Sequence, residues 1–233
     1  HARSWESFAL AMQTKYHVYA LDQRGHGDSA WAEDYSATAM VEDAQRLVTA
    51  LGLKRFVLLG LSMGGRNAYQ FAATYPEEVE RLVIVDIGPA IAATGATRIT
   101  SGVRANDVFA SVEEAVAAGR AGNPRADEAE LQHRTRNNLM LQEDGTWTFR
   151  YDKALRTNNL PRPAAGDAWA MLPKIKAPTL LIRGELSDVL APEVADRMLK
   201  EIPDCKFALV AGSGHSIPLE SPKGFLEAVR TFL

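Results

Sequence analysis

A serine between glycines is the residue best placed for chemistry in this chain. The sequence Gly60-Leu61-Ser62-Met63-Gly64-Gly65 follows an apolar run and precedes a helical pattern, the setting in which such a motif makes a sharp strand-to-helix turn. The turn leaves no room for side chains at Gly60 and Gly64, and it holds the Ser62 hydroxyl clear of the backbone. The first N–H groups of the helix then face a developing oxyanion. We predict that Ser62 is a nucleophile.

A serine hydroxyl needs a base to become nucleophilic, and His215 is the predicted base. It ends the loop sequence Gly212-Ser213-Gly214-His215, directly after the apolar run Lys206–Ala211. Because parallel strands share one carboxyl edge, this loop is expected beside Ser62. We expect the other histidines to be structural or solvated: His1, His17, His26 and His133.

An acid must orient the imidazole of His215, and four carboxylates lie at or just past the end of an apolar run. These candidates are Asp22, Asp86, Glu185 and Asp188. We predict Asp188, which follows the run Thr179–Arg183, and keep Glu185 and Asp86 as the main alternatives.

The elements that position these residues alternate between short apolar runs and helical patterns. The predicted strands are His17–Asp22, Arg55–Leu61, Arg81–Asp86, Thr179–Arg183 and Lys206–Ala211. They are almost entirely apolar, as strands covered on both faces should be. The predicted helices between them are Ala39–Leu53, Gly65–Tyr75, Pro192–Ile202 and Ser221–Leu233. The alternation predicts an α/β fold with a doubly wound, mainly parallel sheet.

One long stretch departs from this alternation. Residues 88–170 contain helix candidates at Val112–Ala121 and Ala126–Met140 and a β-like piece at Thr146–Tyr151. The stretch is too long and too patterned for a loop. We predict a core domain made of residues 1–87 and 171–233, with residues 88–170 as a helical insertion over the sheet.

Composition excludes several other classes of protein. The chain has 233 residues, of which 46% are hydrophobic, and its net charge is −3, so nothing electrostatic favours nucleic acid or an anionic membrane as a partner. Its single cysteine, Cys205, excludes an internal disulfide framework and a multi-cysteine zinc site. No signal peptide and no apolar run of membrane-spanning length are visible, and we expect a cytoplasmic location.

The motifs together resemble the α/β-hydrolase superfamily, specifically its capped serine hydrolases of the esterase or lactonase type. The resemblance rests on Asp22–Ser29 (DQRGHGDS), Gly60–Gly65, Gly184–Asp188 and Gly214-His215. It implies that the backbone N–H of Met63 contributes to an oxyanion hole, that the helical insertion of residues 88–170 is the cap, and that residues 24–29 form a structural loop. It also implies that no metal or organic cofactor is needed.

The function implied is hydrolysis of a small carboxylic ester or lactone through an acyl-enzyme, with a small acyl compound as the partner. Two alternatives stay open. The first is hydrolysis of a carbon–carbon bond in dienoate-type ketones by the same triad. The second is a non-catalytic small-molecule receptor with this fold.

The beginning of the chain departs from the family pattern. Relatives place a His-Gly segment after an earlier strand to supply the second oxyanion N–H, whereas this chain opens His1-Ala2. Residues Ala2–Met12 have a helical pattern, and the first strands of the family sheet have no candidate before His17. We therefore expect roughly 20–30 further residues before His1 in the functional protein.

Overall fold

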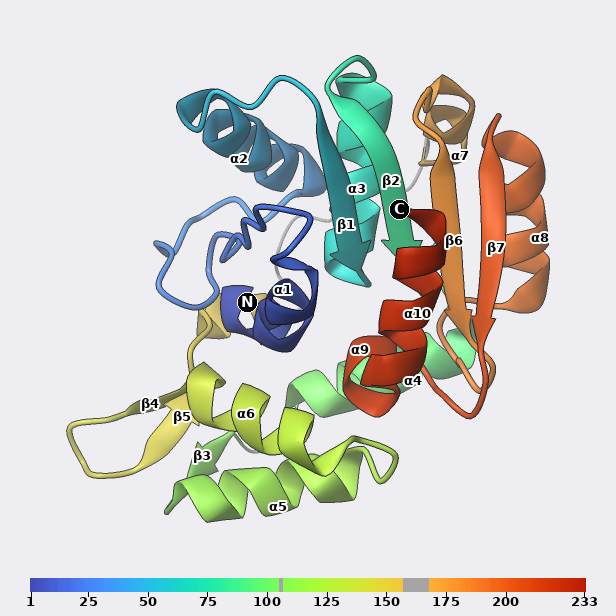
Figure 1. Ribbon diagram of the computed structural model, residues 1–233. Coiled ribbons are helices and arrows are strands. Elements are labelled where there is room, and N and C mark those ends of the chain that lie inside the picture. Colours follow the sequence, from blue (N-terminus) through green and yellow to red (C-terminus); the bar gives the residue numbers. More distant parts are fainter. Residues whose placement is uncertain (105–106, 157–167) are drawn as a thin grey trace. The chain divides into compact units, whose positions relative to one another are not determined.

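The computed structural model describes residues 1–104, 107–156 and 168–233 (Figure 1). The chain forms two compact units, each built from two segments. The sheet unit contains residues 36–98 and 161–233, and the helix-rich unit contains residues 1–35 and 99–160. Among the helices of the described residues, none has both the length and the hydropathy of a membrane-spanning segment.

Four parallel strands form the centre of the sheet unit (Figure 1). In their order across the sheet they are β1 (Phe56–Leu61), β2 (Val79–Val85), β6 (Thr179–Gly184) and β7 (Cys205–Val210). Four of the five predicted strands are thereby confirmed. The register aligns their carboxyl ends, with Leu61 opposite Val85 and Gly184 opposite Val210. The loops that follow all four strands therefore begin at one edge of the sheet.

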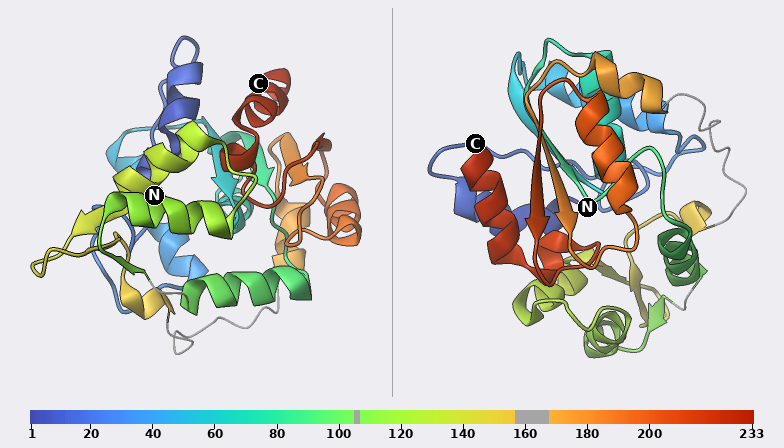
Figure 2. Two further views of the ribbon diagram at one scale, coloured as in Figure 1. Left: turned by 90° about the horizontal axis from the view of Figure 1, so that it is seen from below. Right: turned by 90° about the vertical axis from the view of Figure 1, so that its right-hand side faces the viewer.

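Helices cover both faces of this sheet. The helices of this unit are α2 (Ala37–Ala50), α3 (Met63–Thr74), α7 (Ala168–Met171), α8 (Pro192–Glu201), α9 (Ile217–Glu220) and α10 (Pro222–Phe232), and α4 (Ala93–Arg104) begins in the same unit. Helices α8 and α10 pack on β6 and β7 from opposite faces (Figure 2). Val83 and Ile84 point to opposite faces of β2, and both are completely buried, so the strand is covered on both sides. The predicted doubly wound, parallel arrangement is confirmed.

The helix-rich unit has its own small core. A 3₁₀ turn (Ala2–Trp5) leads into α1 (Glu6–Met12), and the later segment contains α5 (Val112–Gly122) and α6 (Glu128–Asn138). Ser111 and Asp127 cap the latter two helices, each accepting a backbone N–H three residues later. The helical patterns predicted in this stretch are thereby confirmed.

A three-stranded antiparallel sheet completes this unit and was predicted only in part. Its order is β3 (Val108–Phe109), β5 (Trp147–Phe149), β4 (Leu139–Leu141). Phe109, Ala115 and Leu139 are buried between it and α5. The predicted insertion also has different limits from the units, since residues 88–98 group with the sheet unit. Its action as a cap stays a prediction.

The predicted strand His17–Asp22 is wrong. These residues, all within the described part of the chain, form no strand, although His17 and Tyr19 stack with ring centroids 4.3 Å apart. A strand is stable only when a neighbour takes up its backbone N–H and C=O groups. None of the described strands pairs with this segment.

Candidate active site

Ser62 occupies the turn between β1 and α3. Its backbone has φ 55° and ψ −120°, a conformation that a residue with a side chain rarely adopts and that costs about 1–3 kcal/mol. Two hydrogen bonds hold it there. The Ser62 N–H donates to the Val85 carbonyl at 3.0 Å, and the Ser62 carbonyl accepts the Arg66 N–H at 2.9 Å. The strand-to-helix turn predicted around Ser62 is therefore present.

The glycines around Ser62 allow this turn to close. A Cβ atom on Gly60 would lie 2.2 Å from the Gly64 carbonyl oxygen, and one on Gly65 would lie 2.8 Å from the Gly60 carbonyl oxygen. Real Cβ atoms do not approach backbone this closely, so the start of α3 and the end of β1 can pack only without side chains here. The motif is thus a packing requirement of the turn.

His215 lies beside Ser62, as expected from the sequence. It is carried by the loop between β7 and α9, and its Nε2 is 3.0 Å from Ser62 Oγ. Its Nδ1 is 2.8 Å from Asp86 Oδ2. The imidazole side chain is only 11% exposed. Both ring nitrogens therefore have a fixed partner.

Asp86 is the carboxylate that contacts His215. It follows β2 directly, is completely buried, and has a positive φ of 52°. Its Oδ1 accepts the Gly184 N–H at 3.0 Å, and its Oδ2 accepts the Ser187 hydroxyl. Such charge-assisted hydrogen bonds hold the carboxylate in one orientation toward the imidazole.

The prediction of Asp188 as the orienting acid needs correction. Its carboxylate makes a bidentate pair with Arg98 on α4, with Oδ2 2.6 Å from Nε and Oδ1 2.8 Å from Nη2. The hydrogen bond from Arg98 also lowers the pKa of Asp188 below its ordinary value. Among the described contacts, the carboxylate bonded to His215 is that of Asp86.

The other two acids weighed from the sequence bond to backbone. Glu185 accepts the N–H of Gly212 at 2.7 Å. Asp22 accepts the N–H of Ala2 and that of Asp28. The signal that separates Asp86 from these residues is its position, because it directly follows the strand beside the one that leads to Ser62.

Met63 is the first residue of α3. The first N–H groups of a helix have no acceptor within it, and they lie at the positive end of the helix dipole. The backbone N–H of Met63 is therefore suited to the oxyanion role that the sequence resemblance implied. Among the described residues, no group of three or more His, Cys, Asp or Glu side chains is arranged to hold a metal ion.

Comparison with known proteins gives the family. A family model described as the alpha/beta hydrolase family matches residues 1–228. The chain belongs to the alpha/beta hydrolase family. It is 29% identical over 235 residues to mouse sn-1-specific diacylglycerol lipase ABHD11, covering 97% of this hydrolase and 74% of that protein. It is 27% identical over 245 residues to esterase Rv0045c of Mycobacterium tuberculosis, covering 100% and 79%.

Solved structures agree with this placement. The structure of the M. tuberculosis esterase Rv0045c matches this hydrolase with a TM-score of 0.82 at 26% identity, over 100% of this chain and 81% of that one. The crystal structure of E-2-(acetamidomethylene)succinate hydrolase matches with a TM-score of 0.90 at 24% identity, over 99% and 86%, and shows the shared fold. The relatives' names agree with the ester-bond hydrolase expected from the sequence.

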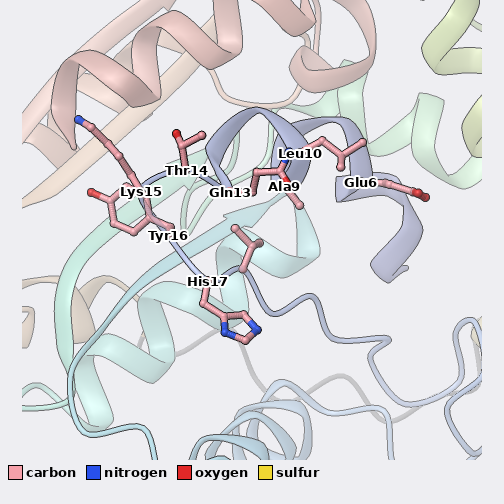
Figure 3. Close-up of a pocket in the computed structure, with 9 residues that line it drawn as sticks. Glu6, Ala9, Leu10, Gln13, Thr14, Lys15, Tyr16 and His17 are labelled. Atoms are coloured by element: carbon pink, nitrogen blue, oxygen red, sulfur yellow. The ribbon is translucent and has the colours of Figure 1, made fainter.

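A separate hollow lies on the helix-rich unit of this hydrolase (Figure 3). It has a volume of about 570 Å³ and is lined by α1 and the residues that follow it. The side chains of Glu6, Lys15 and His17 point in different directions rather than toward one centre (Figure 3). This divergence gives no constellation of polar groups for a ligand, and the catalytic candidates Ser62, Asp86 and His215 are not part of its lining.

Proposed function

We propose that this chain is a serine hydrolase that cleaves small carboxylic esters, lactones included, through a covalent acyl-enzyme. The observation that carries the proposal is the continuous line of hydrogen bonds from Ser62 Oγ through the His215 ring to Asp86, at 3.0 and 2.8 Å. A serine, a histidine and a buried carboxylate joined in this order activate the hydroxyl for attack on an acyl carbon.

Acylation begins when Ser62 Oγ attacks the carbonyl carbon of the ester. The hydroxyl proton moves to His215 Nε2, and Asp86 keeps the Nδ1–H of the imidazole oriented and stabilises the imidazolium. The Met63 N–H donates to the oxyanion of the tetrahedral intermediate. The bond to the alcohol oxygen then breaks, and that oxygen takes the proton from Nε2. The acyl group remains on Ser62.

Deacylation repeats these steps with water as the nucleophile. His215 Nε2 accepts a proton from the water as its oxygen attacks the acyl carbon. The new oxyanion faces the same N–H group. When the intermediate collapses, the bond to Ser62 Oγ breaks and Oγ takes the proton back from Nε2. The products are a carboxylic acid, an alcohol and the free enzyme.

The named relatives support the ester class. They include a diacylglycerol lipase and an esterase at 29% and 27% identity. For this chain we propose small esters first and lactones second. We propose that the part of the predicted cap in the helix-rich unit, residues 99–160, sets the preference.

The decisive test is Ser62→Ala, measured on nitrophenyl esters, lactones and a dienoate ketone. Triad members act as a unit, so the variant is expected to lose about 10⁶-fold in kcat on the ester. It should stay folded because Ser62 lies on a turn and its removal leaves no cavity. Circular dichroism and thermal unfolding check the fold.

Three outcomes would count against the proposal. Ester hydrolysis at a tenth of the wild-type rate in Ser62→Ala would remove Ser62 as the nucleophile. A fluorophosphonate adduct on another serine would do the same. Turnover of the dienoate ketone with negligible turnover of every ester would replace the ester substrate by a carbon–carbon one.

A further inference from the structure

One carboxylate binds the backbone of the two residues on either side of His215. Gly214 and Ser216 are the neighbours of His215 in the chain, and the backbone N–H groups of both donate to Glu220. The Gly214 N–H reaches Glu220 Oε2 at 2.6 Å, and the Ser216 N–H reaches Oε1 at 3.2 Å. Each oxygen of the carboxylate thus accepts the backbone N–H of one of the two residues that flank the histidine.

This arrangement fixes the position of the His215 backbone, from which the imidazole side chain extends. The carboxylate belongs to Glu220, the last residue of the short helix α9, which follows the loop. Its two hydrogen bonds therefore connect the loop to the end of α9. Hydrogen bonds from N–H groups to a charged carboxylate are roughly twice as strong as those between neutral groups. Catalytic geometry must hold to about 0.5 Å, and the His215 side chain is the part of the triad that projects from a loop.

We propose that Glu220 is a positioning residue for the hydrolytic reaction, which holds His215 in line between Ser62 and Asp86 by binding the N–H groups on either side of it. The inference rests on the proposed function of the triad. Glu220 acts through the backbone of the loop and does not exchange a proton with the substrate. Its loss should therefore slow the chemical step without weakening substrate binding.

The chain provides a matched control in Glu185. This carboxylate also accepts a backbone N–H from the same loop, that of Gly212 at 2.7 Å. It differs from Glu220 in two respects. It binds a single N–H group, and that group lies three residues before His215. A general need for a carboxylate on this loop would make both residues equally sensitive.

The experiment compares Glu220→Gln with Glu185→Gln in ester hydrolysis. Glutamine has one acceptor oxygen, so the Glu220 variant leaves one of the two N–H groups facing an NH₂ group. We expect kcat of Glu220→Gln to fall by about 10–100-fold, since small displacements of catalytic groups cost this much. KM should stay within about twofold, and kcat of Glu185→Gln should stay within about threefold of the wild type.

Proton NMR gives a readout that a general loss of stability would not move. The Nδ1–H proton between His215 and Asp86 should give a strongly downfield resonance in the wild type. We expect it to shift or broaden in Glu220→Gln and to stay in place in Glu185→Gln. If Glu220→Gln does not fold, Glu220→Asp replaces it, because its shorter side chain reaches only one of the two N–H groups and should also lower kcat.

Two results would overturn the positioning role. One is a folded Glu220 variant with wild-type kcat and an unchanged resonance. The other is a change in KM with kcat preserved, which would place Glu220 in substrate binding. Ser62→Ala in the same assay separates this inference from the proposed function. If Ser62→Ala is inactive and Glu220→Gln is not impaired, the triad stands and only the role of Glu220 fails.

Discussion

Ser62 and Asp86 both have a positive φ. Among the described residues they are the non-glycine residues with positive φ, at 55° and 52°. Strain of this kind costs about 1–3 kcal/mol per residue and persists only where the surrounding structure over-determines it. Both residues follow directly on neighbouring strands of the sheet. The two strand ends thus present the Ser62 hydroxyl and the Asp86 carboxylate to opposite ring nitrogens of His215.

Asp86→Asn tests the acid that the structure places at the histidine. Asparagine tolerates positive φ at least as well as aspartate, so the backbone should keep its conformation. The amide no longer stabilises the imidazolium and favours the wrong tautomer of His215. We expect kcat to fall by up to ~10⁴-fold. Steady-state kinetics and a crystal structure of the variant would measure both parts of this expectation.

The control for Asp86→Asn is Asp188→Asn. It removes the ion pair with Arg98, whose two side chains are 49% and 33% exposed. Such a pair contributes at most about 1 kcal/mol, so the variant should unfold slightly earlier and keep kcat within about threefold. If Asp188→Asn lost most of its kcat while Asp86→Asn stayed active, the acid that orients His215 would be Asp188.

At the scale of elements, the end of β6 must pass very close to the loop of His215. A Cβ atom on Gly184 would lie 2.1 Å from the Gly214 carbonyl oxygen and 2.6 Å from that of Ser213. The N–H of the same glycine also donates to Asp86. Because Gly184 has no side chain, the end of β6 can contact both Asp86 and the loop that carries His215.

Gly184→Ala is therefore expected to lower both stability and kcat. The added methyl group meets backbone, so the histidine loop must move away, and displacement of this order costs about 100-fold in rate. Denaturant unfolding and kcat measure the two effects. Gly212→Ala is the control, because Gly212 has φ +66° and open space around it. It should cost about 1 kcal/mol of stability and leave kcat nearly unchanged. Equal losses of kcat in the two variants would contradict the close-approach argument.

The sequence predicted four strands of the sheet unit because each is a continuous apolar run between helical patterns. The run His17–Asp22 carries the same local signal and forms no strand. Strand formation depends on a neighbour that is remote in the sequence, and an apolar run contains no information about that neighbour. The same limit applies to the short strands β3 and β4, which have two and three residues.

Ser62 and His215 were predictable because a tight glycine turn and a loop after a strand carry local signals. The choice between Asp86 and Asp188 was not local. It depended on Arg98, which lies 90 residues from Asp188 in the sequence and forms an ion pair with its carboxylate. Glu220 was missed because a glutamate in a short helix has no distinguishing pattern until the loop folds over it.

At the scale of the whole molecule, the triad belongs entirely to one unit. Ser62, Asp86 and His215 all lie in the sheet unit, whereas residues 99–160 belong to the helix-rich unit. If the predicted cap sets the substrate preference, exchange of residues 99–160 should change that preference and leave the triad residues in place.

Replacement of residues 99–160 by the equivalent segment of another capped hydrolase is the corresponding test. The exchange leaves Arg98 and its contact with Asp188 in place. We expect the ratio of kcat/KM values across an ester panel to follow the donor, while fluorophosphonate still labels Ser62. A chimera that is labelled and keeps the original preference would place specificity in the sheet unit.

The separation of the sheet unit into two chain segments has a consequence during synthesis. Ser62 and His215 are 153 residues apart. At about 5–20 residues per second, a ribosome takes roughly 8–30 s to travel from one to the other. During that interval Ser62 in the nascent chain lacks its base, His215. For much of it, the edge of β2 that later pairs with β6 has no partner strand. The growing chain is therefore chemically inert but prone to aggregate, and its need for chaperones should be greatest before β6 emerges.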